Sequence, residues 1–101
     1  MKTGIELIAA ERNRQIEEKG WTAEHDDSHK KEELAMAAVA FALPDSLYGL
    51  KRTFWPFGEP CLAHFNAYTQ NKQKRIRELS KAGALIAAEI DRLQREIEKE
   101  K

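Results

Sequence analysis

The chain has 101 residues, which is the length of one domain and too short for a substrate domain plus a separate cofactor domain. Its 17 basic and 17 acidic residues cancel, so no overall charge draws it to nucleic acid or to an anionic membrane. We therefore expect no specific nucleic-acid partner, and any site for an anion must be local.

Three features bear on the compartment. Cys61 is the only cysteine and cannot form an internal disulfide, which favours a reducing environment. The longest apolar run, residues 34–43, has ten residues where a membrane span needs about 20. The first residues show no basic region followed by an apolar stretch, so we expect no secretory signal and a cytoplasmic protein.

The first expected helix covers about residues 4–19. Thr3 and Glu6 match the capping box, in which a threonine hydroxyl and a glutamate three residues later satisfy free backbone donors. Apolar residues then recur at helical steps as far as Ile16, and Gly20 supplies a C-terminal cap.

A second helix is expected at about 29–43. Residues 21–28 are polar and rich in capping side chains, which predicts a loop or one helical turn. Leu34 and Phe41 then mark an apolar stripe, and Pro44 forbids its continuation.

Residues 44–60 contain three prolines, two glycines and a cluster of aromatic side chains. This composition is typical of turns and predicts an irregular loop. A connection of that length in so small a domain is more often a binding loop than a spacer. A further short helix at 61–70 is left open.

The clearest pattern predicts a third helix over residues 72–99. Apolar residues alternate steps of three and four, which is a heptad seam. The seam comprises Ile76, Leu79, Gly83, Ile86, Ile90, Leu93 and Ile97. Such a helix would be about 42 Å long, longer than either earlier helix can cover, so we expect a homo-oligomer built through it. The expected fold is a single all-α domain, 1–101, forming a small helical bundle with an irregular aromatic and proline-rich loop.

Residues 24–29 place two imidazoles and three carboxylates in a short segment. His25 and His29 would share a helical face that Glu33 continues, and imidazole plus carboxylate can bind a divalent ion. The alternative is that the acidic residues cap the next helix while the histidines face solvent.

Basic residues close to aromatic residues form a second candidate site, since guanidinium groups grip phosphate oxygens and aromatic faces stack on bases. The alternative is that the aromatic residues cover the core and the basic residues form a solvated face. The basic residues are Arg12, Arg14, Lys19, Lys51, Arg52, Lys72, Lys74, Arg75 and Arg77, and the aromatic pair beside Arg52 is Phe54 and Trp55.

Several motifs resemble small proteins encoded by bacteriophages and prophages. They are Glu11-Arg-x-x-Gln15, Lys19-Gly-Trp-Thr-x-Glu-His-Asp-Asp-x-His29, Trp55-Pro56 and Lys81-Ala-x-Ala-Leu-Ile-x-Ala-Glu-Ile-x-Arg-Leu93. The helical pattern also resembles the all-α MazG-type nucleoside triphosphate pyrophosphohydrolases. That likeness implies magnesium held by Glu-x-x-Glu and Glu-x-x-Asp pairs, but here Glu33 is followed at that offset by Met36, and Glu89 by Arg92.

The phage resemblance implies a host-cytoplasmic protein that sequesters a nucleotide-type signal, such as a cyclic nucleotide or an ADP-ribose derivative, without a metal and without turnover. The expected ligand-binding residues are Arg12, Lys19, Trp21, His25, Asp26, His29, Trp55 and Lys81. One alternative is a magnesium-dependent pyrophosphohydrolase, whose expected metal ligands are Glu24, Asp26, Asp27, Glu33 and Glu89. Another is a helical module that binds a host protein through the heptad seam.

Overall fold

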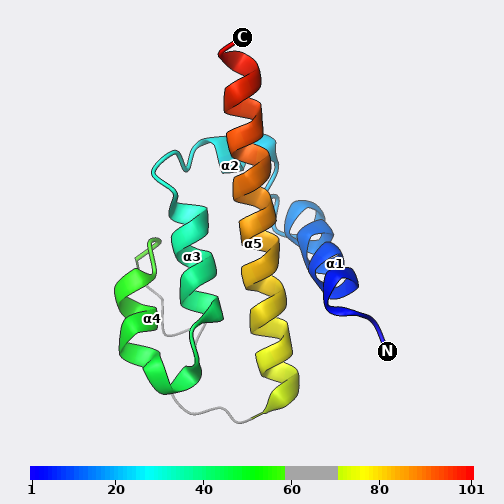
Figure 1. The fold of residues 1–101 in the computed structure, drawn as a ribbon, viewed down its shortest axis with the longest axis vertical. Coiled ribbons are helices and arrows are strands. Elements are labelled where there is room, and N and C mark those ends of the chain that lie inside the picture. The colour runs from blue at the N-terminus through cyan, green and yellow to red at the C-terminus, as the bar shows by residue number, and fades with distance from the viewer. Residues whose placement is uncertain (59–70) are drawn as a thin grey trace.

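The structure is a computed structural model that describes residues 1–58 and 71–101, and every regular element in these ranges is helical (Figure 1). The expected all-α bundle with a long C-terminal helix is confirmed. Its elements are α1 (Gly4–Glu17), α2 (Ala23–Asp27), α3 (Glu33–Ala42), the 3-10 turn η1 (Asp45–Leu47), α4 (Tyr48–Phe54) and α5 (Lys72–Lys99).

Helix α5 is the spine of the fold. Figure 1 shows α3 and α1 on opposite sides of it, with α4 on the outer side of α3 and α2 crossing near the C-terminal half of α5. The last turns of α5 rise beyond the other helices. The core lies between α3 and α5 and consists of Leu34, Ala37, Ala38, Ala40, Phe41, Ala82, Leu85 and Ala88.

Helix α1 begins as its sequence predicts. The Thr3 hydroxyl accepts from the Glu6 N–H at 3.2 Å, and the Glu6 carboxylate accepts from the Thr3 N–H at 2.9 Å, so the capping box is confirmed. Gly20 adopts a φ of 71°, and this left-handed turn allows the Trp21 N–H to donate to the Gln15 carbonyl at 3.0 Å. The helix ends at Glu17, two residues before its predicted end.

The segment between α1 and α3 contains the expected helical turn. Thr22 caps α2 by accepting from the His25 N–H, and the acidic residues of this segment do not cap the next helix, since the N-cap of α3 is Glu32 and makes no side-chain cap hydrogen bond. The prediction that the next helix begins at residue 29 is wrong, because α3 begins at Glu33. Glu32 has a φ of 63°, and this left-handed backbone conformation prevents a continuous helix from α2 into α3.

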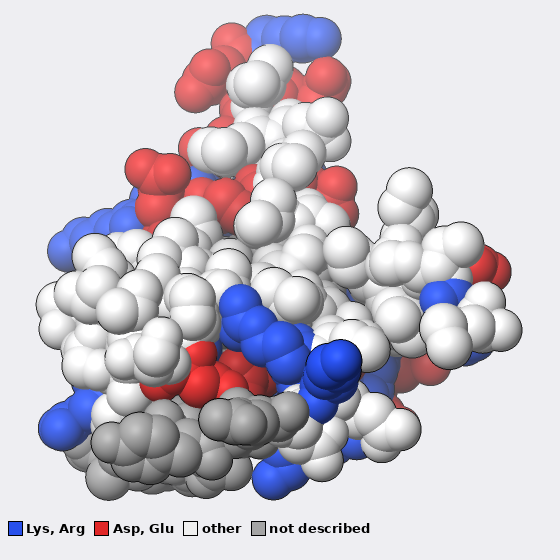
Figure 2. All heavy atoms as spheres, turned by 60° about the horizontal axis from the view of Figure 1, so that its bottom comes forward, with Lys and Arg blue, Asp and Glu red and all other residues white. Residues whose placement is uncertain are grey.

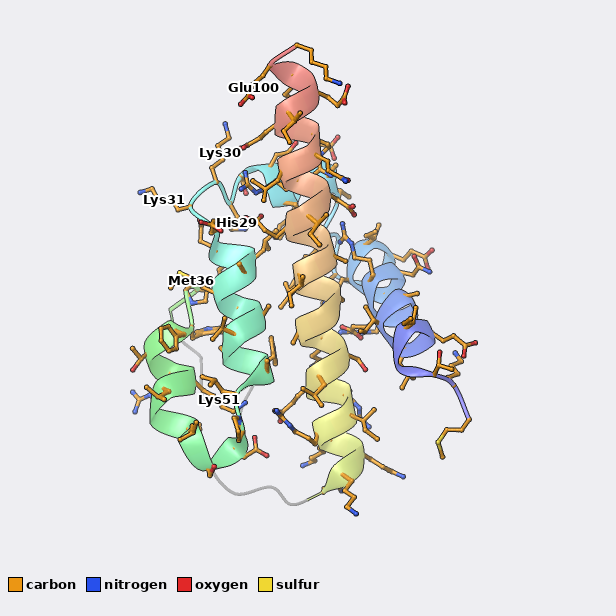
Figure 3. All side chains as sticks on the ribbon, in the orientation of Figure 1. His29, Lys30, Lys31, Met36, Lys51 and Glu100 are labelled. Carbon is orange, nitrogen blue, oxygen red and sulfur yellow. The ribbon has the colours of Figure 1, made fainter. Side chains whose placement is uncertain are left out.

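The prediction of an irregular loop over 44–60 is wrong for residues 45–54, which form η1 and α4. Lys51 of α4 is fully buried, points toward the end of α3 (Figure 3), and donates to the carbonyls of Ala40 and Phe41 and to Glu78. The long-range contacts of Lys51 hold α4 in place. Arg75 of α5 donates to the carbonyls of Ala42 and Leu43 at the end of α3. Residues 59 and 60, the optional helix at 61–70 and Cys61 lie outside the described residues.

Helix α5 has the predicted bounds, and Asn71 caps it by accepting from the N–H groups of Gln73 and Lys74. Another helix approaches α5 closely at Gly83, since Ile8 of α1 lies directly over this glycine. The rest of the seam does not face the core, because α3 and α1 cover other sides of the helix. No described helix is long and apolar enough to span a membrane.

Candidate functional site

A cavity of about 540 Å³ lies between α1, α3, α5 and the segment that follows α4. This volume is within the range of small-molecule sites, which is about 300–1,000 Å³. The described residues that line it are Glu11, Arg14, Gln15, Lys19, Trp21, Ala37, Phe41, Trp55, Phe57, Arg77, Lys81 and Leu85. Its wall therefore combines large aromatic rings with four basic side chains.

Aromatic rings brace one side of the cavity. Trp21 stacks on His25 with 5.6 Å between ring centroids and an interplanar angle of 2°. His25 meets His29 at 4.9 Å, and His29 meets Phe57 edge to face at 5.2 Å. The two histidines therefore link two aromatic residues of the cavity wall, Trp21 and Phe57, without themselves lining the cavity.

The same chain of rings continues along the wall. Phe57 meets Trp55 at 5.4 Å and 84°, and Trp55 meets Phe41 at 5.6 Å and 88°. Edge-to-face pairs of this kind add about 0.5–1.5 kcal/mol each beyond their buried area. These ring contacts join α3 to the segment after α4 along the wall.

The charges at the cavity are unbalanced. Arg14 is held by Glu11 through two hydrogen bonds of 2.8 Å, so this pair is neutral as a unit. Lys19, Arg77 and Lys81 form no salt bridge with any described residue. Three cations with no salt bridge to a described residue therefore face a cavity that has four aromatic rings in its wall, which is an arrangement suited to an anion that carries a flat ring.

Burial changes the acid–base behaviour of two cavity residues. Burial lowers the pKa of Lys81, although the Glu11 carboxylate acts in the opposite direction. Burial also acts to raise the pKa of Glu11, but hydrogen bonds from Arg14 and Gln15 and the charge of Lys81 outweigh it and leave that pKa below its usual value. The Lys81 ammonium also lies 5.6 Å from the Phe41 ring centroid, a cation–π distance.

Gln15 fixes the geometry of the α1 side. It is 1% exposed, its Nε2 donates to Glu11 at 3.3 Å, and its backbone carbonyl accepts from the Trp21 N–H. Gln15 therefore connects the Glu11–Arg14 ion pair of α1 to Trp21 in the segment that follows α1. Its Oε1 has no hydrogen-bond partner among the described residues.

The structure brings together half of the expected ligand-binding residues. Lys19, Trp21, Trp55 and Lys81 line the cavity. The other four lie behind or beside it. His25 and His29 brace the rings, as described above, and the buried Asp26 carboxylate accepts from Arg12 at 3.2 Å and lies 3.0 Å from Nδ1 of His25. These four residues support the site and do not form its wall.

Sequence reasoning did not assign Arg14, Gln15, Phe41, Phe57 and Arg77 to the expected ligand-binding set. One signal was present for α5, where Arg77, Lys81 and Leu85 follow one another at steps of four and so share a helical face. Phe41 was assigned to an apolar stripe, and nothing in its spacing indicates that its ring also borders a cavity.

The carboxylates expected to hold magnesium do not converge. Among residues 1–58 and 71–101, no three histidine, cysteine, aspartate or glutamate side chains are grouped as metal ligands. Asp26 pairs with Arg12. Each of the others has a different location: Asp27 accepts from Arg95, Glu33 lies against His29, Glu89 accepts from Arg92, and Glu24 is exposed.

In two of these pairings the partner lowers the pKa of the carboxyl group. The hydrogen bond from Arg95 lowers the pKa of Asp27. Burial acts to raise the pKa of Glu33, but the contact with His29 and a backbone hydrogen bond from Lys31 lower it overall. Both carboxylates therefore already have partners within the fold.

Comparisons with protein-family models, with curated proteins and with solved structures each gave no match.

Proposed function

We propose that the protein binds a nucleotide-type ligand in the cavity between α1, α3 and α5 and sequesters it without turning it over. The observation that carries the proposal is the set of three cations, Lys19, Arg77 and Lys81, which have no salt-bridge partner among the described residues and face an aromatic wall. The resemblance to phage proteins favours a signalling nucleotide, such as a cyclic nucleotide or an ADP-ribose derivative.

The phosphate groups and the base of such a ligand match the basic and the aromatic side chains of the cavity wall. The cations attract phosphate oxygens, and charge-assisted hydrogen bonds are the stronger kind. Trp21, which His25 supports from outside the cavity wall, and Trp55 supply aromatic surface for a base. Base–aromatic stacking contributes about 1–3 kcal/mol per base and does not depend on which base is present.

Sequestration is favoured over magnesium-dependent hydrolysis by the partners of the carboxylates. Metal-assisted cleavage of a triphosphate needs several carboxylates around one ion. Here Asp26, Asp27 and Glu89 each accept a hydrogen bond from an arginine. Recruiting them to a metal would break those ion pairs.

Ligand recovery tests the proposal directly. The protein is incubated with nucleoside triphosphates, cyclic nucleotides and ADP-ribose derivatives, with and without magnesium, and its melting temperature is measured. The ligand is then released by denaturation and chromatographed. We expect at least one nucleotide to raise the melting temperature by mass action and to be recovered intact. Recovery of cleaved ligand would contradict sequestration, and no shift with any nucleotide would contradict binding.

Variants locate the site. We expect Arg77→Ala and Trp21→Ala each to weaken binding by about tenfold to a hundredfold, since a hydrogen bond to a charged group contributes about 1.5–3 kcal/mol and a stacked base about 1–3 kcal/mol. Lys74→Ala is the matched control, because Lys74 is an exposed cation of α5 that does not line the cavity. Equal losses in Arg77→Ala and Lys74→Ala would place the ligand elsewhere.

A further inference from the structure

Helix α5 carries an apolar strip that the other described helices leave uncovered. It consists of Ile76, Leu79, Ile86, Ile90, Leu93 and Ile97, which are between 41% and 55% exposed. These residues keep the heptad spacing on either side of Gly83, over which Ile8 of α1 lies, whereas the core is formed by a different face that contains Ala82, Leu85 and Ala88. We call this surface the α5 strip.

The α5 strip continues sideways onto α1. Leu7 and Ile8 of α1 line, with Ile76 and Leu79, an open groove of about 360 Å³ near the start of both helices. Ile5 on the same helix is 82% exposed. Figure 2 shows uncharged surface running up the column of α5 between acidic groups on its two sides. The apolar surface is therefore continuous and has charged edges, as interfaces between proteins commonly do.

We propose that the α5 strip is the interface with a second copy of this chain, and that the two α5 helices pair in antiparallel orientation. A heptad seam of isoleucine and leucine is complementary to another such seam, because each side chain fits between four of the facing helix. A second copy supplies a matching seam of the same length.

Charge along α5 favours the antiparallel arrangement. Residues 72–85 contain five basic residues and one acidic residue, whereas residues 86–99 contain four acidic and three basic residues. Parallel pairing would place the two strongly basic halves together. Antiparallel pairing separates the two basic halves, although Arg77 and Lys81 of these halves line the ligand cavity and not the strip, and it also opposes the two helix dipoles.

The shape of the chain supports the same arrangement. The C-terminal turns of α5 project beyond the bundle (Figure 1), whereas the groove is lined by Ile76 and Leu79 near the start of the helix. In an antiparallel pair centred near Ile86, the partner's Leu93 and Ile97 lie beside Ile76 and Leu79 and fill the groove. The projecting end of each copy is then covered by α1 and α5 of the other.

The area that the α5 strip alone can bury is smaller than a stable interface requires, so α1 must also take part in the contact. From Ile76 to Ile97 the strip is about 32 Å long, and a helix with side chains is about 10 Å wide, so two copies bury roughly 640 Å² along α5 alone. A stable interface buries about 1,200 Å² or more. The groove and the exposed side chains of α1 must supply the remainder, which the antiparallel pair allows.

Molar mass tests the interface. The purified full chain is measured by light scattering during size-exclusion chromatography over a hundredfold range of concentration. We expect twice the mass of one chain for the wild type and a single-chain mass for the double variant Ile86→Lys/Ile90→Lys. Gln73→Lys, an exposed position on another face of α5, is the control and should remain a dimer. A monomeric wild type at every concentration would overturn the proposal, as would a double variant that stays dimeric.

Circular dichroism and nucleotide binding show whether the double variant folds. Lys81 and Leu85 line the ligand cavity on a face of α5 away from the strip, so a folded monomer should bind nucleotide as the wild type does. If the double variant loses helix content, the milder Leu93→Gln/Ile97→Gln pair replaces it, and we expect at least a tenfold rise in the dimer dissociation constant. An unchanged constant for that folded pair overturns the proposal.

Disulfide cross-linking tests the orientation. On a Cys61→Ser background, Ile76→Cys and Ile97→Cys are oxidised separately and then as a mixture. Antiparallel pairing predicts a cross-linked product in the mixture alone, because the two positions are about 32 Å apart on one helix. Cross-linking of each variant with itself would show a parallel pair and overturn the orientation. Mass heterogeneity that indicates only higher aggregates would overturn the two-copy assignment.

Discussion

The Arg12 guanidinium donates to the Asp26 carboxylate at 3.2 Å, and the aspartate is fully buried. This contact ties α1 to α2 and holds Asp26 beside the His25 ring. The acidic and imidazole-rich segment is therefore anchored from within the fold, and its histidines are free to brace the aromatic wall.

Removal of the Asp26 carboxylate should destabilise the fold strongly. We expect Asp26→Ala to lower the free energy of unfolding by about 3–5 kcal/mol, because it leaves the Arg12 charge without its buried partner. The measurement is urea denaturation followed by circular dichroism. Asp91→Ala is the control, since Asp91 lies 3.8 Å from the same guanidinium but is 52% exposed, and we expect a loss of at most about 1 kcal/mol. Similar losses of unfolding free energy for both variants would contradict the conclusion that Asp26 is the main partner of Arg12.

Gly83 and Ile8 should behave as a coupled pair. A Cβ at Gly83 would lie 2.5 Å from Cδ1 and 2.7 Å from Cγ1 of Ile8, so alanine forces the Ile8 side chain, or α1 with it, to shift. We expect Gly83→Ala to destabilise the wild type, since overpacking costs about 1–3 kcal/mol and exceeds the helix-propensity gain of about 1 kcal/mol.

An Ile8→Ala background removes the obstacle, so the sign of the Gly83→Ala effect should reverse there. The gain should approach the helix-propensity term, about 1 kcal/mol. A double-mutant cycle of unfolding free energies at one fixed protein concentration measures this coupling. If Gly83→Ala changes the free energy of unfolding in the same direction in both backgrounds, contact with Ile8 is not the reason for glycine at this position.

The elements that the sequence predicts well are those with local signals. The capping box at Thr3 and the heptads of α5 involve residues three or four positions apart, so their pattern can be recognised without knowledge of the fold. Helix α4 depends instead on Lys51, whose partners at Ala40 and Glu78 lie 11 and 27 residues away. Its sequence is flanked by prolines and carries no comparable local pattern.

The site follows the same division. Residue type led to the expectation that Lys19, Trp21, Trp55 and Lys81 form part of a ligand site, and these four residues line the cavity. It was not enough to separate wall residues from supporting ones. His25 and His29 have the spacing of metal ligands, but the first lies against Asp26 and the second against Glu33, and both join aromatic rings. Only the folded chain shows that distinction.

Ligand affinity should depend on pH through Lys81. Burial lowers the pKa of this ammonium, so it loses its proton at a lower pH than an exposed lysine would. The charged form attracts the anionic ligand, and affinity should therefore fall as the pH rises through the lowered pKa. Lys81→Arg should remove this fall, because a guanidinium stays charged throughout the range.

Isothermal titration with the nucleotide selected by the ligand panel, from pH 7 to pH 10, measures the effect. Lys74→Arg changes an exposed cation outside the cavity and should leave the wild-type pH profile unaltered. A Lys81→Arg profile that falls in parallel with the wild type would mean that another group controls the loss of affinity. Direct titration of the Lys81 ammonium by NMR separates the two cases, since a lysine that keeps its usual pKa cannot produce the early decline.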